Sequence, residues 1–122
     1  MKNDIEVRTF DFALRTVRLF KYLQSDKKEF ILSKQVLRSG TSIGANVCES
    51  QQAQSKADFI SKMSIALKEA VETEYWLRLL VSSDYLAENE FNSLRKDLKE
   101  IIKILTSIIK TSKSNIDRDK NK

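Results

Sequence analysis

The sequence predicts an all-α protein folded as an antiparallel up-down-up-down four-helix bundle. Its 122 residues contain no proline and two glycines, whereas strands and turns usually need more of both. Apolar residues recur every three or four positions over four segments, which is the helical spacing. The segments are long and the polar stretches between them are short, so successive helices are expected to pack antiparallel.

The first two helices are predicted from about Asp4 to Gln24 and from about Lys28 to Gln54, with a polar break between them. In the first, the spacing predicts a core-facing stripe of Phe10, Ala13, Leu14, Val17 and Phe20. In the second, the corresponding stripe is Leu32, Val36, Gly40, Ile43 and Val47.

The third helix is predicted to begin after Ser55, because Asp58 three residues later resembles a capping box. Its stripe is Phe59, Met63, Ala66, Ala70, Leu77 and Val81, and residues 82–84 end it. The fourth helix is predicted from about Glu88 to Ser112, with a heptad series of Phe91, Leu94, Leu98, Ile101, Leu105 and Ile108. Residues 1–112 would thus form the bundle, and 113–122 a polar, disordered tail.

Both glycines lie within the second helix, four residues apart and therefore on one side of it. Each costs about 0.5–1 kcal/mol relative to alanine in a helix interior. Gly40 and Gly44 are therefore expected where another helix approaches closely, and Cys48 extends this line of small residues by one turn. This pattern indicates packing rather than catalysis.

Three of the helices carry a second apolar face, which a monomer would leave in contact with water. At about 100° per residue, the members of these faces fall away from the main stripes. They are Phe12, Leu19 and Leu23 on the first helix, Leu37, Gly44 and Cys48 on the second, and Ile65, Trp76 and Leu79 on the third. Exposed apolar patches usually mark an interface, so a homo-oligomer is expected. The alternative is a set of scattered exposed apolar residues.

Glu74 falls on the main stripe of the third helix, between Ala70 and Leu77. A buried carboxylate needs a partner, and Arg78 one turn later is the nearest candidate in sequence. Glu74 is either such a paired charge or an acid or metal ligand.

The absence of histidine removes the usual general base and the commonest metal ligand. No glycine-rich phosphate loop is present either, so we expect a protein that is not an enzyme and that holds no metal or cofactor. A single cysteine cannot form an internal disulfide. No apolar run approaches the about 20 residues of a membrane span, and the start does not look like a signal peptide. The expected location is the reducing cytoplasm, away from membranes.

The net charge of +5 is spread along the chain, so its arrangement on surfaces decides whether it makes a binding site. One sector of the fourth helix and one face of the first are predicted to gather basic residues: Lys96, Lys99, Lys103 and Lys110, and Arg8, Arg15 and Arg18. Repeated around an oligomer, these stripes would attract nucleic acid. No aromatic reader motif accompanies them, so base-specific readout is not indicated. The alternative is a solvated lysine face.

Two joined motifs resemble a known family. They are Arg38…Ser42-Ile43-Gly44-Ala45-Asn46-Val47…Glu49 and Ser55-Lys56…Asp58-Phe59-Ile60…Ser64-Ile65-Ala66-Leu67…Glu72…Glu74. They are similar to the four-helix-bundle proteins encoded in 23S rRNA intervening sequences, a family that includes the accessory variability determinant of diversity-generating retroelements. The resemblance covers about residues 8–110. Family members often have proline where this chain has Gly44.

The resemblance implies an antiparallel four-helix protomer assembled into a homopentameric barrel. The retroelement member binds its reverse transcriptase and nucleic acid through a basic surface, so the resemblance makes RNA, DNA, a reverse transcriptase or another nucleoprotein the expected partners. It supplies no defined biochemical activity, and it is no ground for inferring membership of the ribosome. Two hypotheses follow. The first is a non-enzymatic oligomeric helical scaffold that binds nucleic acid or a nucleoprotein partner through basic stripes. The second is a protein–protein adaptor without nucleic-acid binding.

Overall fold

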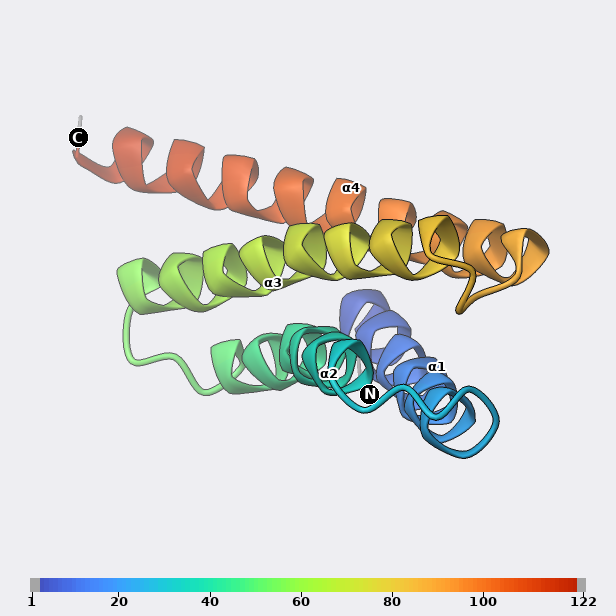
Figure 1. Ribbon diagram of the computed structural model, residues 1–122. Coiled ribbons are helices and arrows are strands. Elements are labelled where there is room, and N and C mark those ends of the chain that lie inside the picture. Colours follow the sequence, from blue (N-terminus) through green and yellow to red (C-terminus); the bar gives the residue numbers. More distant parts are fainter. Residues whose placement is uncertain (1–2, 121–122) are drawn as a thin grey trace.

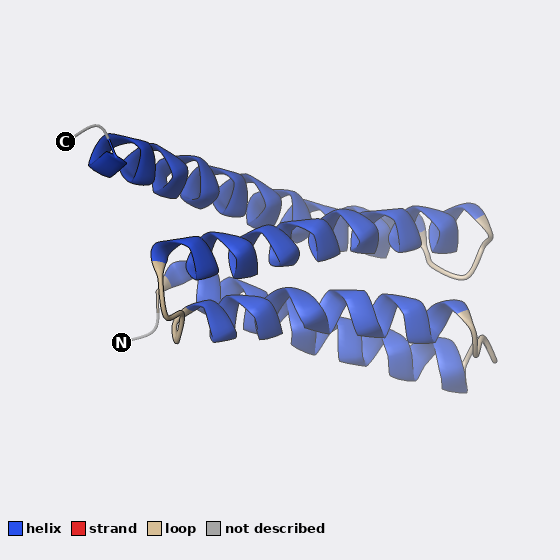
Figure 2. Cartoon of the chain, turned by 90° about the vertical axis from the view of Figure 1, so that its left-hand side faces the viewer, coloured by secondary structure: helices blue, strands red, loops and turns tan. Residues whose placement is uncertain are grey.

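The computed structural model describes residues 3–120, which form four α-helices and no strand. The helices are α1 (Asp4–Ser25), α2 (Leu32–Ser50), α3 (Lys56–Ser82) and α4 (Glu88–Lys120). Each packs beside its neighbour in sequence, and α4 returns beside α1, which closes the bundle (Figures 1 and 2). Of these neighbouring pairs, α1 and α4 contact each other least. Within residues 3–120, no helix is long and apolar enough to cross a membrane.

The core lies along the axis of the bundle and is built mainly from branched aliphatic side chains. On α2, α3 and α4 the buried residues follow the predicted stripes closely, because those stripes repeat at helical spacing over many turns. Among the largest fully buried side chains are Val36, Ile43, Val47, Met63, Leu77, Leu80, Leu94, Leu98, Ile101 and Leu105.

On α1, the two apolar faces exchange the roles that the sequence predicted for them. Phe12 is 2% exposed and Leu19 is also buried, so both belong to the core of the protomer rather than to a second, outward face. Phe10 is 59% exposed, and Leu14 is also exposed, although both were expected in the core. The helical period correctly separates the two faces, but their similar apolarity does not indicate which one turns inward.

Two buried threonines mark the line along which α1 meets α2, and the glycines of α2 lie opposite them. A Cβ atom added at Gly40 would lie 2.5 Å from Cγ2 of Thr16. One added at Gly44 would lie 3.1 Å from the backbone oxygen of Thr9. The glycines therefore make room for α1 within the protomer, and the close approach expected of them is between α2 and α1.

The loop before α2 is longer than predicted, because α2 begins at Leu32 and not near Lys28. Lys28 has a left-handed backbone (φ 54°), which interrupts any continuous helix there. The next residue, Glu29, is buried, and its Oε1 accepts hydrogen bonds from the backbone N–H groups of Ile31 (3.0 Å) and Ser33 (2.8 Å). This carboxylate satisfies two of the free donors at the start of α2. At its other end, α2 stops at Ser50 and not near Gln54.

The other predicted boundaries are set by local caps. Asn3 Oδ1 accepts from the Glu6 N–H (2.9 Å) at the start of α1. Ser55 Oγ accepts from the Asp58 N–H (3.0 Å) at the start of α3, which is one half of a capping box. In return, Asp58 Oδ2 accepts from the Gln54 N–H (3.3 Å), one residue before the N–H that a capping box uses. The chain leaves α3 through Asp84, which adopts the left-handed conformation (φ 67°) that a glycine often supplies.

The last helix continues to Lys120, beyond the end predicted at Ser112. Arg118 and Lys120 lie in its last turn, where positive charge is favoured by the helix dipole. Asp119 Oδ2 pairs with Lys56 Nζ at the start of α3, at 2.6 Å. This pair ties the end of α4 to α3, although their sequences are far apart. Residues 121–122 lie outside the described part of the chain.

Candidate nucleic-acid interface

Basic residues follow the outer face of α4, opposite the buried Leu94–Leu105 stripe. Lys96, Lys103 and Lys110 are exposed, and none of them forms an ion pair within residues 3–120. The helical repeat places all of them within one sector, because they are separated by seven residues. They are called the α4 lysine face below.

Lys99 lies beside this face, toward α3, where it contacts Glu74. Glu74 Oε2 lies 3.4 Å from Lys99 Nζ and 3.7 Å from Arg95 Nε, so α4 supplies both of its cationic partners. The predicted partner Arg78 is not among them, which corrects the expectation from sequence. Glu74 Oε2 is buried and accepts no hydrogen bond from any described residue, but both cations of α4 lie within ion-pair distance of it, so Glu74 is a paired charge at the α3–α4 contact.

Arg15 belongs to a different cluster, since it reaches from α1 to α4. Its guanidinium donates to Asp97 Oδ2 (2.7 Å), Glu90 Oε1 (3.2 Å) and Ser93 Oγ (3.0 Å). Glu90 and Asp97 neutralise this arginine. Arg15 therefore fastens the α1–α4 contact and is not free to bind phosphate.

The other two arginines of α1 differ in their surroundings. Arg8 Nε donates to Asp4 Oδ2 one turn earlier (2.8 Å), and this hydrogen bond raises the pKa of Arg8. Arg18 is exposed and has no ion pair within residues 3–120. Of these three arginines, only Arg18 is both exposed and without an ion-pair partner among the described residues.

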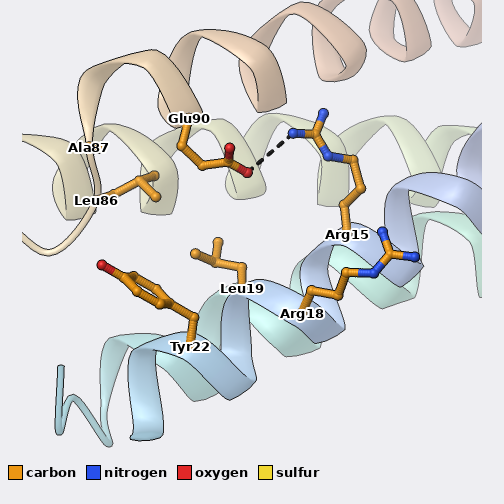
Figure 3. A pocket seen from close by; sticks show the side chains of 7 residues that line it. All are labelled: Arg15, Arg18, Leu19, Tyr22, Leu86, Ala87 and Glu90. Carbon is orange, nitrogen blue, oxygen red and sulfur yellow. Dashed lines mark hydrogen bonds and ion pairs between the residues drawn. The ribbon is translucent and has the colours of Figure 1, made fainter. Parts of the chain in front are cut away.

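Arg15 and Arg18 also line a cleft of about 530 Å³ between the second half of α1 and the start of α4 (Figure 3). Leu19 and Leu86, both buried, form its apolar floor, and Tyr22 and Glu90 complete its walls. No sequence motif indicated this cleft, because its two sides come from segments about seventy residues apart. The sequence indicated only that Arg15, Arg18 and Tyr22, spaced by three and four residues, share one face of a helix.

Of the residues expected at an oligomer contact or a close helix contact, Cys48 and Ile65 are exposed, whereas Phe12, Leu19 and Gly40 are buried within the protomer. Cys48 is exposed rather than packed between helices, and it lines an apolar groove of about 310 Å³ between α1 and α2 together with Gly44 and Ala45. On α3, Ile65 is exposed and Leu79 is half-buried.

Trp76 is also half-buried, and a hydrogen bond holds its indole in place. Its Nε1 donates to Glu72 Oε2 at 3.0 Å, and Arg38 from α2 donates to the same carboxylate. These contacts, that of Trp76 first, lower the pKa of Glu72 below its ordinary value. Two motif residues far apart in sequence, Arg38 and Glu72, thus meet at the α2–α3 contact.

The chain is similar to proteins of one family over most of its length. The family profile described as 23S rRNA-intervening sequence protein matches residues 1–107. A crystal structure at 1.70 Å resolution of a protein of unknown function from the S23 ribosomal protein family of Bacteroides thetaiotaomicron is 55% identical. The match covers 87% of this chain and 98% of that one, with a TM-score of 0.86. Among curated proteins there is no match.

Proposed function

The chain belongs to the 23S rRNA-intervening sequence protein family, and from this premise we propose that it is a non-enzymatic, oligomeric scaffold that binds nucleic acid or a nucleoprotein partner. The observation that carries the proposal is the α4 lysine face. Three exposed lysines without carboxylate partners keep their full charge available for phosphates. Assembly into a ring, five protomers by the resemblance, would repeat this face and sum its field.

Binding through this face depends on charge and not on base sequence. Lysine ammonium groups release counterions when they meet phosphates, so the affinity falls steeply as salt rises. Contacts to phosphate fix position but carry no sequence information. RNA, DNA and the nucleic acid of a reverse-transcriptase complex are all ligands of this chemistry.

The test is a double charge reversal on the α4 lysine face, Lys103→Glu with Lys110→Glu. Its control is Lys21→Glu with Lys34→Glu, which changes the net charge equally at exposed positions on α1 and α2. Affinity for mixed-sequence RNA and DNA is measured by fluorescence anisotropy at low and moderate salt. The α4 variant should lose about ten-fold or more at low salt and should show a shallower salt dependence.

Equal losses in both double variants would show that only net charge matters and that α4 holds no defined site. Absence of binding by the unmutated protein would favour the second candidate, a protein–protein adaptor. The apolar groove between α1 and α2, lined by Gly44, Ala45 and Cys48, supports that candidate because apolar surfaces are typical of protein contacts.

A further inference from the structure

The cleft between α1 and α4 has two chemically different ends. Tyr22 and Leu86 lie at one end, and Arg15 and Arg18 lie toward the other, with Leu19 between them on the floor (Figure 3). Tyr22 is 39% exposed, and its hydroxyl has no hydrogen-bond partner within residues 3–120. The ring therefore offers an apolar, π-bearing surface that the described fold leaves open.

One of the two arginines in the cleft has no carboxylate partner within residues 3–120 and is available to a ligand. Arg15 is matched by Glu90 and Asp97, whereas Arg18 has no carboxylate partner among the described residues. Arg18 and Tyr22 are four residues apart on α1, so their Cα atoms lie about 6 Å apart along the helix axis, about one turn. A ligand that fits both ends must combine a flat apolar body with a single anionic group.

We infer that this cleft binds one unpaired nucleotide, with its base against Tyr22 over Leu19 and Leu86 and its phosphate at Arg18. The base and phosphate of a nucleotide are joined through a sugar, so one nucleotide can present a flat ring and an anionic group to two separate side chains of the cleft. The volume of about 530 Å³ lies in the range of small-molecule sites. Stacking of a base on an aromatic side chain tolerates any base, so the site distinguishes unpaired from paired strands and not one sequence from another.

This inference rests on the proposed function, and it adds a strand preference that lysines alone cannot give. The α4 lysine face meets phosphates, which single strands and duplexes both present. A base can enter the cleft only when it is unpaired. The nucleotide comes either from a single strand or from the free pool, and the chemistry of the two sources is the same.

The experiment compares Tyr22→Leu, Tyr22→Phe and Arg18→Gln in the otherwise unaltered protein. The probes are a mixed-sequence single-stranded RNA, the duplex of the same sequence, and adenosine monophosphate. We expect Tyr22→Leu to weaken single-strand binding about ten-fold and to leave duplex binding unchanged, since one stack is lost. Tyr22→Phe keeps the ring and should bind as the unmutated protein does. Arg18→Gln should cost a few-fold at low salt, the effect of one phosphate contact.

Salt separates this site from the α4 lysine face. The factor lost in Tyr22→Leu should be the same at low and moderate salt, because stacking is not ionic, whereas the factor lost in Lys103→Glu with Lys110→Glu should shrink. Adenosine monophosphate that binds as tightly as the strand, with the same Tyr22 dependence, assigns the cleft to the free nucleotide. If Tyr22→Leu changes the affinity for none of the three probes, the inference is wrong. This holds even where the lysine variant supports the proposed function. If no strand binds, the proposed function fails. NMR chemical-shift changes on addition of adenosine monophosphate then test the cleft separately: changes that disappear in Tyr22→Leu show that it binds a nucleotide.

Discussion

At the scale of single residues, the contact between α1 and α2 depends on the absence of side chains at Gly40 and Gly44. Both glycines face α1 threonines whose hydroxyls bond to their own helix, Thr9 to the Ile5 oxygen and Thr16 to the Phe12 oxygen. The threonine side chains are thus already positioned and cannot move aside without losing a hydrogen bond.

We predict that Gly40→Ala destabilises the protein by about 1–3 kcal/mol, the usual cost of overpacking. The added Cβ would lie 2.5 Å from Thr16 Cγ2, and this clash outweighs the better helix propensity of alanine. Gly44→Ala should cost less, since its closest contact is 3.1 Å. Urea unfolding at a fixed protein concentration measures both.

The double variant Gly40→Ala with Thr16→Ala is the control, because it removes the group that clashes. Its free energy of unfolding should be higher than the value obtained by adding the effects of the two single substitutions. Strict additivity would show that the added methyl group does not meet Thr16.

A second residue-scale prediction concerns Glu72, whose pKa is lowered first by the hydrogen bond from Trp76 and also by Arg38. Trp76→Phe removes this donor, so the pKa of Glu72 should rise toward its ordinary value of 4.5. Carboxyl chemical shifts followed by NMR during an acid titration measure it.

The sign of the pH effect follows from this direction. A carboxylate with a lowered folded-state pKa stabilises the fold above its ordinary pKa and loses this contribution as pH falls through the folded-state value. Between those two pH values, the unmutated protein should therefore lose stability more steeply than Trp76→Phe. Parallel stability curves for the two proteins in this acidic range would contradict the assignment.

At the scale of elements, the start of α2 depends on one buried carboxylate and not on a serine or threonine cap. Glu29 is 8% exposed and accepts from the backbone N–H of Ile31, just before α2, and from that of Ser33 in its first turn. The positive end of the helix dipole favours its charge at this position.

We predict that Glu29→Ala costs about 1–2 kcal/mol, the scale of a lost helix cap. Glu29→Gln keeps an acceptor oxygen and should cost less. Hydrogen exchange at the Ser33 amide should accelerate in Glu29→Ala while amides in the middle of α3 stay protected. Unchanged exchange at Ser33 would show that the cap does not hold the first turn.

At the scale of the whole molecule, the protomer leaves apolar surface uncovered on two sides. Val7 and Leu14 are exposed on α1, beside the groove that reaches Cys48, and Ile65, Val71 and Tyr75 are exposed on α3. Two separate patches suit a ring, in which each subunit meets two neighbours through different surfaces.

We predict that the purified protein forms an assembly several times the 14.1 kDa chain mass, with five copies as the expected number. Sedimentation equilibrium and light scattering measure it. Leu14→Glu with Tyr75→Glu places charge on both surfaces and should shift the assembly toward monomer. The control Lys34→Glu should leave the mass unchanged. A monomer at micromolar concentration in the unmutated protein would contradict a ring.

Much of the fold could be predicted from the sequence, because helix period, caps and breaks are local. The four helices, the Ser55 N-cap of α3 and the core stripes of α2 to α4 all follow from residues within a few turns of one another. The continuation of α4 to Lys120 was not predicted from local pattern, and the ion pair of its last turn is with Lys56, a residue distant in sequence.

The tertiary structure alone decided which face of α1 turns inward and which charges remain available. Two apolar faces of similar strength satisfy the same helical period, so only packing against α2 and α4 selects Phe12 over Phe10. Charge pairs between helices depend on the arrangement of those helices. This arrangement neutralises Arg15, gives Glu74 its partners on α4, and brings Tyr22 beside Leu86 in a cleft whose two sides come from segments distant in sequence.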